Sequence, residues 1–138
     1  EEAQEKGYAE ADPTGDVEGI DAQGKIEILS NTVMGGNLEL SDVETEGITD
    51  ITLEDVQEAK EDGYRWKLIG KTKRTENGIE AKVGPEKLPM DHPLAGVMGP
   101  TNALTYSTDY LNDVTIIGPG AGKKETGFAL LVDLLSIR

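Results

Sequence analysis

The sequence predicts an α+β fold, with a single mostly antiparallel or mixed sheet of four to five strands that helices cover on one face. Two observations indicate this class. Apolar side chains recur at helical spacing early in the chain, and they alternate at a spacing of two along later segments. The order helix, helix, four strands, helix is typical of a sheet whose helices gather on one side.

The first helix is predicted from about Asp16, and Gly35-Gly36 is expected to end it. Its apolar positions recur at i, i+4, i+7 and i+11, and they are predicted to pack on the sheet against Trp66 or Leu68. These positions are Ala22, Ile26, Leu29 and Val33. A second helix is predicted after the capping pattern Thr52-Leu-Glu-Asp, running to Gly63.

Four segments with alternating or short apolar patterns predict the strands. YRWKLI (64–69) and GIEAKV (78–83) alternate apolar and charged side chains, and Asn77-Gly78 between them predicts a type I′ hairpin turn. Two further strands are predicted at about Asn102–Thr108 and Val114–Ile117. After the glycine-rich segment GPGAG, a closing helix is predicted from about Glu125 to Ile137.

Length and composition indicate one domain, residues 1–138, with an aliphatic core. The net charge of −14 argues against nucleic acid or an anionic membrane as partner, because binding phosphate requires clustered Lys and Arg. The longest apolar run, Phe128–Val132, is too short to span a bilayer. The absence of cysteine fits a reducing compartment, and we expect a cytoplasmic protein. The chain lacks an initiator Met and is expected to be a fragment.

A crowded acidic segment precedes a single lysine near the start of the first helix. Five carboxylates that repel one another need a cation or hydrogen-bond donors, and Lys25 follows the last of them by one helical turn. We predict that Glu10, Asp21 and Lys25 converge, with Lys25 partly buried in a polar cleft. The alternative is an ordinary surface ion pair between Asp21 and Lys25. The carboxylates are Glu10, Asp12, Asp16, Glu18 and Asp21.

Other motifs are less specific. GPGAGKK lacks the spacing of a phosphate-binding P-loop, which leaves close backbone approach to an anion or a tight strand-to-helix turn. His92 is the only histidine, and without a second histidine or a cysteine no zinc site or Ser-His-Asp triad is predicted. We therefore predict no dedicated metal site, although casual binding of Na⁺, Mg²⁺ or Ca²⁺ by the acidic segment stays open.

Three segments together resemble the catalytic domain of homoserine dehydrogenases. They are GYAEADPTGDVEGIDAQGK (7–25), HPLAGVMGPTNAL (92–104) and GPGAGKKETGFALLVDLL (118–135), and they keep the order of that family. The resemblance implies an oxidoreductase that interconverts L-aspartate 4-semialdehyde and L-homoserine with NAD(P)H, in threonine and methionine biosynthesis. The alternative is a non-catalytic acidic module that binds an amino acid or a cation.

The same resemblance implies roles for individual residues. Lys25 matches the catalytic lysine that donates a proton to the carbonyl oxygen. Glu10, Asp16 and Asp21 match substrate-binding acids, and Gly7 and Gly122 match backbone contacts near the cofactor and substrate.

The resemblance also implies that a Rossmann domain precedes this region in the whole protein. That domain is absent from the chain, which is therefore expected to be inactive alone, with no cofactor bound. The family resemblance further implies a homodimer, with a small amino acid as substrate.

Overall fold

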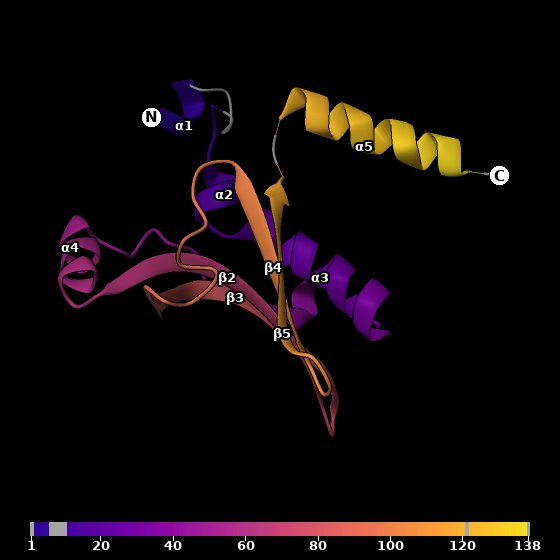
Figure 1. The fold of residues 1–138 in the computed structure, drawn as a ribbon, viewed down its shortest axis with the longest axis horizontal. Coiled ribbons are helices and arrows are strands. Elements are labelled where there is room, and N and C mark those ends of the chain that lie inside the picture. The colour runs from indigo at the N-terminus through magenta and orange to yellow at the C-terminus, as the bar shows by residue number, and fades with distance from the viewer. Residues whose placement is uncertain (1, 6–10, 121, 138) are drawn as a thin grey trace. The chain divides into compact units, whose positions relative to one another are not determined.

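A computed structural model describes residues 2–5, 11–120 and 122–137. The chain forms two compact units. One comprises residues 9–90, and the other comprises residues 1–8 and 91–138. Figure 1 shows the helices and strands of both units.

The unit of residues 9–90 contains a three-stranded mixed sheet and its helices. The strands lie in the order β1-β3-β2, with β1 parallel and β2 antiparallel to β3. The helix α3 packs on this sheet (Figure 1). In chain order the elements are α2 (Thr14–Val17), α3 (Ile20–Met34), the 3-10 helix η1 (Leu40–Asp42), β1 (Val43–Thr45), α4 (Leu53–Glu61), β2 (Tyr64–Thr75) and β3 (Gly78–Pro89).

The other unit contains a two-stranded antiparallel sheet. It comprises α1 (Glu2–Glu5), β4 (Thr101–Thr108), β5 (Asn112–Pro119) and α5 (Lys123–Ser136). Thr108 pairs with Asn112 at the end of the hairpin, and Asn112 adopts φ 57°. Residues 109–111 form a three-residue turn, and the left-handed residue follows it as the first residue of β5; three-residue loops with a left-handed residue are a common way to connect two antiparallel strands.

The predicted α+β class is confirmed, and five strands are present in the described residues. They do not form the single sheet that the sequence predicted, because β4 and β5 pair only with each other. The strand β1 was not predicted. With three residues and a single buried side chain, Val43, it is too short to show a period.

The first helix begins later than predicted, because Gly19 interrupts it. Gly19 is buried with φ 79°, and a side chain there would lie 3.3 Å from Thr45 Cγ2 and 3.4 Å from Val83 Cγ1. This left-handed conformation favours glycine and separates α2 from α3. The predicted end is confirmed, since Gly35 follows Met34 with φ 64°.

The core of this unit lies between α3 and the sheet. Ile26 is buried there, and Ala22, Leu29 and Leu68 pack around it, as the apolar spacing predicted. Val33 was wrongly assigned to this stripe, since it is 54% exposed in the last turn of α3. The buried members of the cluster are Ile26, Val43, Ala81 and Val83.

The β2–β3 hairpin is confirmed, but its turn differs from the predicted one. Thr75 pairs with Gly78, so Glu76 and Asn77 form the two-residue turn. Type I′ geometry requires positive φ at both central residues, and Asn112 is the only described non-glycine residue with positive φ. The turn is therefore not type I′.

The predicted cap of α4 is confirmed atom by atom. Thr52 Oγ1 accepts a hydrogen bond from the Asp55 backbone N–H at 3.1 Å, and Asp55 Oδ2 accepts from the Thr52 N–H at 2.8 Å. The Thr52 hydroxyl also donates to Asp55 Oδ2 at 2.5 Å. These hydrogen bonds, first from the Thr52 side chain and then from its backbone, lower the pKa of Asp55.

This cap makes stability depend on pH in the acidic range. Because the pKa of Asp55 is lower in the folded chain, the contribution of Asp55 is present above its unfolded pKa and is lost as pH falls through its folded pKa. We expect Asp55→Asn to be less stable than wild type at neutral pH and to converge with it in acid. Urea unfolding at several pH values measures this, with Asp62→Asn at the other end of α4 as the control. A difference between wild type and Asp55→Asn that does not vary with pH contradicts it.

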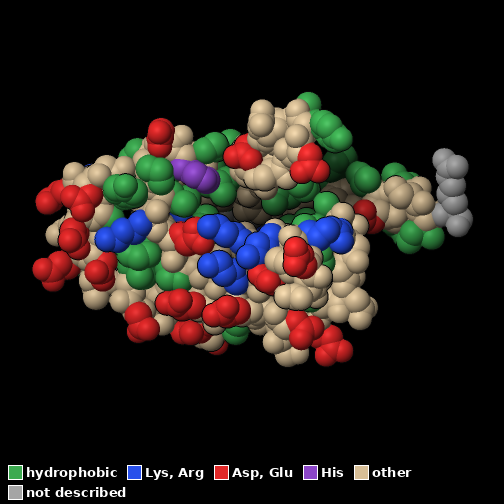
Figure 2. Space-filling model, turned by 90° about the horizontal axis from the view of Figure 1, so that it is seen from below, with side chains coloured by type: hydrophobic (Ala, Val, Ile, Leu, Met, Phe, Trp, Pro, Cys, Tyr) green, Lys and Arg blue, Asp and Glu red, His purple; other side chains and the backbone are tan. Residues whose placement is uncertain are grey.

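Charge is unevenly distributed over the surface. In the view of Figure 2, carboxylates cover much of the face and basic side chains gather in one band. More than half of the 13 basic residues lie in β2 and β3. Among these residues, Lys71 forms an ion pair with Glu86 at 2.5 Å, and Lys73 forms one with Glu80 at 2.9 Å. The seven residues are Arg65, Lys67, Lys71, Lys73, Arg74, Lys82 and Lys87.

The helix α5 has no buried side chain. Its large apolar residues are at least 42% exposed, which leaves a largely exposed apolar surface in its unit. They are Phe128, Leu130, Leu131, Val132, Leu134 and Leu135. Among the described residues, no helix combines the length and the apolar character that crossing a bilayer requires.

Candidate functional site

The helix α3 brings together two of the predicted site residues. Lys25 Nζ donates a hydrogen bond to Asp21 Oδ2 at 2.5 Å, one helical turn away. The neighbouring Ala22 and Ile26 turn toward the sheet, so packing holds the helix while the pair lies on its outer side. The predicted proximity of Asp21 and Lys25 is therefore confirmed.

The predicted partial burial of Lys25 is wrong. The Lys25 side chain is 59% exposed and that of Asp21 is 55% exposed. As an exposed i, i+4 pair, the two stabilise the helix by only about 0.2–0.5 kcal/mol. Within this chain the pair therefore presents a cation and a carboxylate to solvent. Its small contribution to the stability of the helix does not account for the presence of these two side chains.

Polar contacts that the sequence did not reveal fix the position of α3. Gln23 Nε2 donates to the backbone oxygens of Leu40 at 2.9 Å and Val43 at 3.2 Å, which ties the helix to η1 and β1. The buried Ser30 hydroxyl donates to Thr72 Oγ1 on β2 at 2.8 Å. Hydrogen bonds between segments so distant in sequence leave no periodic signal, and only the folded chain identifies them.

The C-terminal end of α3 is held in the same way. The Arg74 guanidinium donates to the Met34 backbone oxygen, at the end where a helix favours positive charge. Asn31, in the last turns of α3, bonds to Leu38 beyond the helix: Asn31 Oδ1 accepts from the Leu38 N–H at 2.8 Å, and Asn31 Nδ2 donates to the Leu38 oxygen at 2.9 Å. The helix that bears Asp21 and Lys25 is thus anchored along its whole length.

The acidic segment before α3 is only partly described. Asp12 Oδ1 accepts hydrogen bonds from the Thr14 hydroxyl at 2.6 Å and its N–H at 3.1 Å, and these lower the pKa of Asp12. Asp16 lies on α2 and is exposed. Glu10 and Gly7 lie outside the described residues, so their predicted places in the site stay predictions.

Gly122, the other predicted cofactor contact, precedes α5. It adopts φ 138°, and a side chain there would overlap the carboxylate of Glu125. Its backbone oxygen accepts from the Thr126 N–H at 3.0 Å. The described residues of the glycine-rich segment thus extend from the end of β5 at Pro119 to the start of α5 at Lys123, which agrees with the strand-to-helix turn that the sequence allowed. Glu125 supplies negative charge in the first turn of α5, where a helix favours it.

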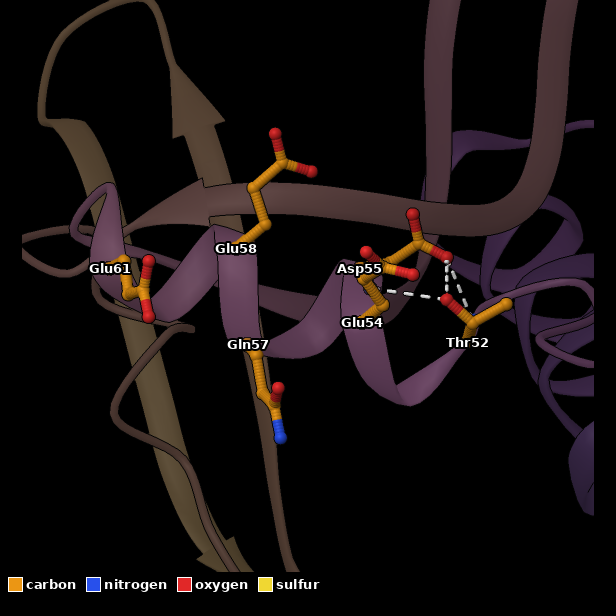
Figure 3. Close-up of a pocket in the computed structure, with 6 residues that line it drawn as sticks. All are labelled: Thr52, Glu54, Asp55, Gln57, Glu58 and Glu61. Atoms are coloured by element: carbon orange, nitrogen blue, oxygen red, sulfur yellow. Dashed lines mark hydrogen bonds between the residues drawn. The ribbon is translucent and has the colours of Figure 1, made fainter.

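The described residues give no support to a metal centre. They contain no group of three or more His, Cys, Asp or Glu side chains placed to hold an ion. A depression beside α4 is lined by Glu54, Glu58 and Glu61 among others, and Figure 3 shows these carboxylates pointing apart. His92 lies in a loop, and its Nδ1 accepts from the Leu94 N–H at 3.1 Å.

The sequence model of one family, described as homoserine dehydrogenase, matches residues 1–135. A similar curated protein is the NAD(+)-dependent homoserine dehydrogenase of Pseudomonas canavaninivorans, 47% identical over 137 residues, which cover 99% of this chain and 39% of that protein. Homoserine dehydrogenase of Bacillus subtilis (strain 168) is 42% identical over 136 residues, which cover 99% of this chain and 31% of that one.

Solved structures agree with these relatives. The crystal structure of homoserine dehydrogenase from S. aureus superposes with a TM-score of 0.88 at 41% identity, over 97% of this chain and 34% of that one. A hyperthermophilic archaeal homoserine dehydrogenase mutant in complex with NADPH superposes with a TM-score of 0.73 at 30% identity, over 97% and 37%. The chain thus spans only about a third of the length of the proteins that it matches.

Proposed function

The chain belongs to the homoserine dehydrogenase family, and we propose that it is the substrate-binding and catalytic part of an NAD(P)-dependent enzyme that interconverts L-aspartate 4-semialdehyde and L-homoserine. The observation that carries the proposal is the Asp21–Lys25 pair, exposed on the outer side of a firmly anchored helix. Family membership supports the reaction, and the pair supplies groups that the reaction needs.

Lys25 acts on the oxygen of the substrate. Reduction of an aldehyde leaves negative charge on the carbonyl oxygen, and an ammonium that donates its proton there lowers the barrier. NAD(P)H supplies the hydride when it is bound. A lysine on an exposed helical face can meet a substrate without moving the helix.

Asp21 serves both Lys25 and the substrate. The substrate is an amino acid whose ammonium would be repelled by Lys25 if no carboxylate lay between them. Asp21 Oδ2 already accepts from Lys25 Nζ, and its second oxygen can accept from the substrate ammonium. Asp16 and Glu10 are proposed as the further acids that hold this ammonium.

The described residues do not form a dinucleotide-binding fold, so we assign most of the cofactor site to the rest of the protein. The chain's β-strands belong to a small mixed sheet and a two-stranded sheet, with no βαβ unit that opens on a glycine fingerprint. Gly122, and Gly7 outside the described residues, are proposed as backbone contacts. The uncovered apolar side chains of α5 support a further domain as the partner of this unit.

We also propose that the protein is a homodimer. An isolated two-stranded sheet is marginally stable in water, and β4–β5 carries apolar cross-strand pairs, Leu104 with Ile116 and Tyr106 with Val114. Ile116 is 60% exposed, which supports a second copy as the cover of this face.

Activity and cofactor binding test the proposal together. The whole protein is expected to oxidise homoserine with NAD⁺ or NADP⁺ and to sediment as a dimer. The isolated chain 1–138 is expected to show no turnover and no heat of binding when titrated with NADPH. A whole protein that binds homoserine and leaves NAD(P)⁺ unreduced would support the amino-acid-binding alternative. Micromolar binding of NADPH to the chain alone would contradict our placement of the cofactor site.

A further inference from the structure

The turn between β2 and β3 contains the only asparagine of the chain that precedes a glycine. The chain has five asparagines, and the residues that follow the other four are Thr32, Leu38, Ala103 and Asp113. A following side chain hinders attack by its own backbone nitrogen on the asparagine carboxamide. At Gly78 this hindrance is absent.

The surroundings of Asn77 also favour this attack. Asn77 and Gly78 are both exposed, and nothing lies within 4 Å of the position that a Cβ of Gly78 would take. The Asn77 backbone N–H donates to Thr75 Oγ1 at 3.3 Å, whereas no hydrogen bond of its carboxamide is found among the described residues. By contrast, three hydrogen bonds hold the carboxamide of Asn31, whose Nδ2 donates to Glu27 Oε1 and to the Leu38 backbone oxygen and whose Oδ1 accepts from the Leu38 N–H.

We propose that Asn77 is a site of spontaneous deamidation in the folded protein. The Gly78 backbone nitrogen attacks Asn77 Cγ, the Cγ–Nδ2 bond breaks, and the amide leaves as ammonia with the proton of the Gly78 nitrogen. The product is a five-membered succinimide. Water then adds to either of its carbonyl carbons and opens the ring, which yields aspartate or isoaspartate at position 77.

The fold allows this reaction at low cost. Thr75 and Gly78 form the last pair of the hairpin, and only this pair has to open for the Gly78 nitrogen to reach Cγ. The hydrogen bonds at the tip are exposed, and such ends open locally without unfolding the core. The core contacts of the sheet, at Ala81 and Val83, lie beyond the opened pair.

The isoaspartate product changes the hairpin. Its main chain runs through the former side chain and is longer by one methylene, so the turn no longer closes the Thr75–Gly78 pair in the same register. Either product adds a carboxylate three residues after Arg74 in the chain, and the Arg74 guanidinium donates to the Met34 backbone oxygen at the end of α3. Under the proposal, this new negative charge attracts the Arg74 guanidinium and weakens its hydrogen bond to Met34, which is one of the anchors of α3.

Peptide mass spectrometry of the whole protein, aged in mildly alkaline buffer, tests the proposal. Deamidation raises the mass of a peptide because an amide becomes an acid. The peptide that contains Asn77 is expected to show this mass increase many-fold faster than the peptides with Asn37 and Asn102, which are also exposed. Isoaspartate is expected as the main product, detected by its different retention time.

Two further measurements make the test decisive. Asn77→Gln, which forms the corresponding imide much more slowly, is expected to abolish the early mass gain of this peptide. The deamidation rate of Asn77 is also measured in denaturant, and its ratio to the native rate shows how far the folded turn slows the reaction. An Asn77 that deamidates no faster than Asn37 and Asn102 in the native protein overturns the proposal, as does an unchanged mass gain in Asn77→Gln.

Discussion

Replacement of Lys25 by alanine in the whole protein is expected to lower kcat by roughly 10²–10⁴-fold, the contribution of a positioned general acid. KM for homoserine is expected to change much less, because the ammonium interacts most strongly when the substrate oxygen carries negative charge. Steady-state kinetics in both directions measure the two constants.

Matched variants separate the proposed roles. Lys25→Arg keeps the positive charge but cannot readily give up a proton. Compared with Lys25→Ala, we therefore expect it to recover substrate binding more than turnover. Asp21→Ala is expected to raise KM as well, since it removes a partner of the ammonium in the ground state. Lys60→Ala, an exposed lysine on α4, serves as the control and is expected to keep wild-type kcat. A folded Lys25→Ala enzyme with wild-type kcat would show that Lys25 has no catalytic role and forms only a surface ion pair.

Substitutions at the contact of α3 with β2 are expected to have the largest effects on stability. Ile26 is 7% exposed, and Ile26→Ala is expected to lower the free energy of unfolding by about 2–5 kcal/mol. Gly70 lies opposite, and a methyl group there would overlap the Ile26 side chain. Gly70→Ala is therefore expected to cost about 1–3 kcal/mol through overpacking.

The double variant tests whether these two losses share a cause. The methyl of Gly70→Ala can enter the space that Ile26→Ala vacates, so we expect the double variant to be more stable than the sum of the single losses predicts, by about 0.5–3 kcal/mol. Urea unfolding of all four proteins measures the coupling. Gly24→Ala, in the same helix but with nothing within 4 Å of the added methyl, is the control and is expected to stabilise by up to about 1 kcal/mol. Additive losses would contradict the predicted contact.

The elements that the sequence predicted well are those with a local cause. The cap of α4 needs only Thr52 and Asp55, and the anchoring of α3 follows from the spacing of Ala22, Ile26 and Leu29. The pairing of Asp21 with Lys25 is equally local, since one helical turn separates the two.

The features that were missed depend on distant segments. The strand β1 exists because Val43 pairs in parallel with Ala81, and neither residue identifies the other in the sequence. The break before α3 depends on Thr45 and Val83, which surround Gly19. The division into two sheets could not be foreseen because alternation reveals strands and not their partners.

The exposure of the Asp21–Lys25 pair has a consequence for where the chemistry can occur. In water at moderate ionic strength, the attraction between two unit charges a few ångströms apart is about 1 kcal/mol, and dissolved ions reduce it further beyond roughly 10 Å. The ammonium of a lysine whose side chain is 59% exposed therefore offers a developing alkoxide little more than water does. The same ammonium acts much more strongly once a covering domain replaces solvent with a medium of low polarity. Under the proposed function, we therefore expect the reactivity of Lys25 to arise only in the assembled protein, and we expect the unassembled chain to leave free aldehydes unreduced.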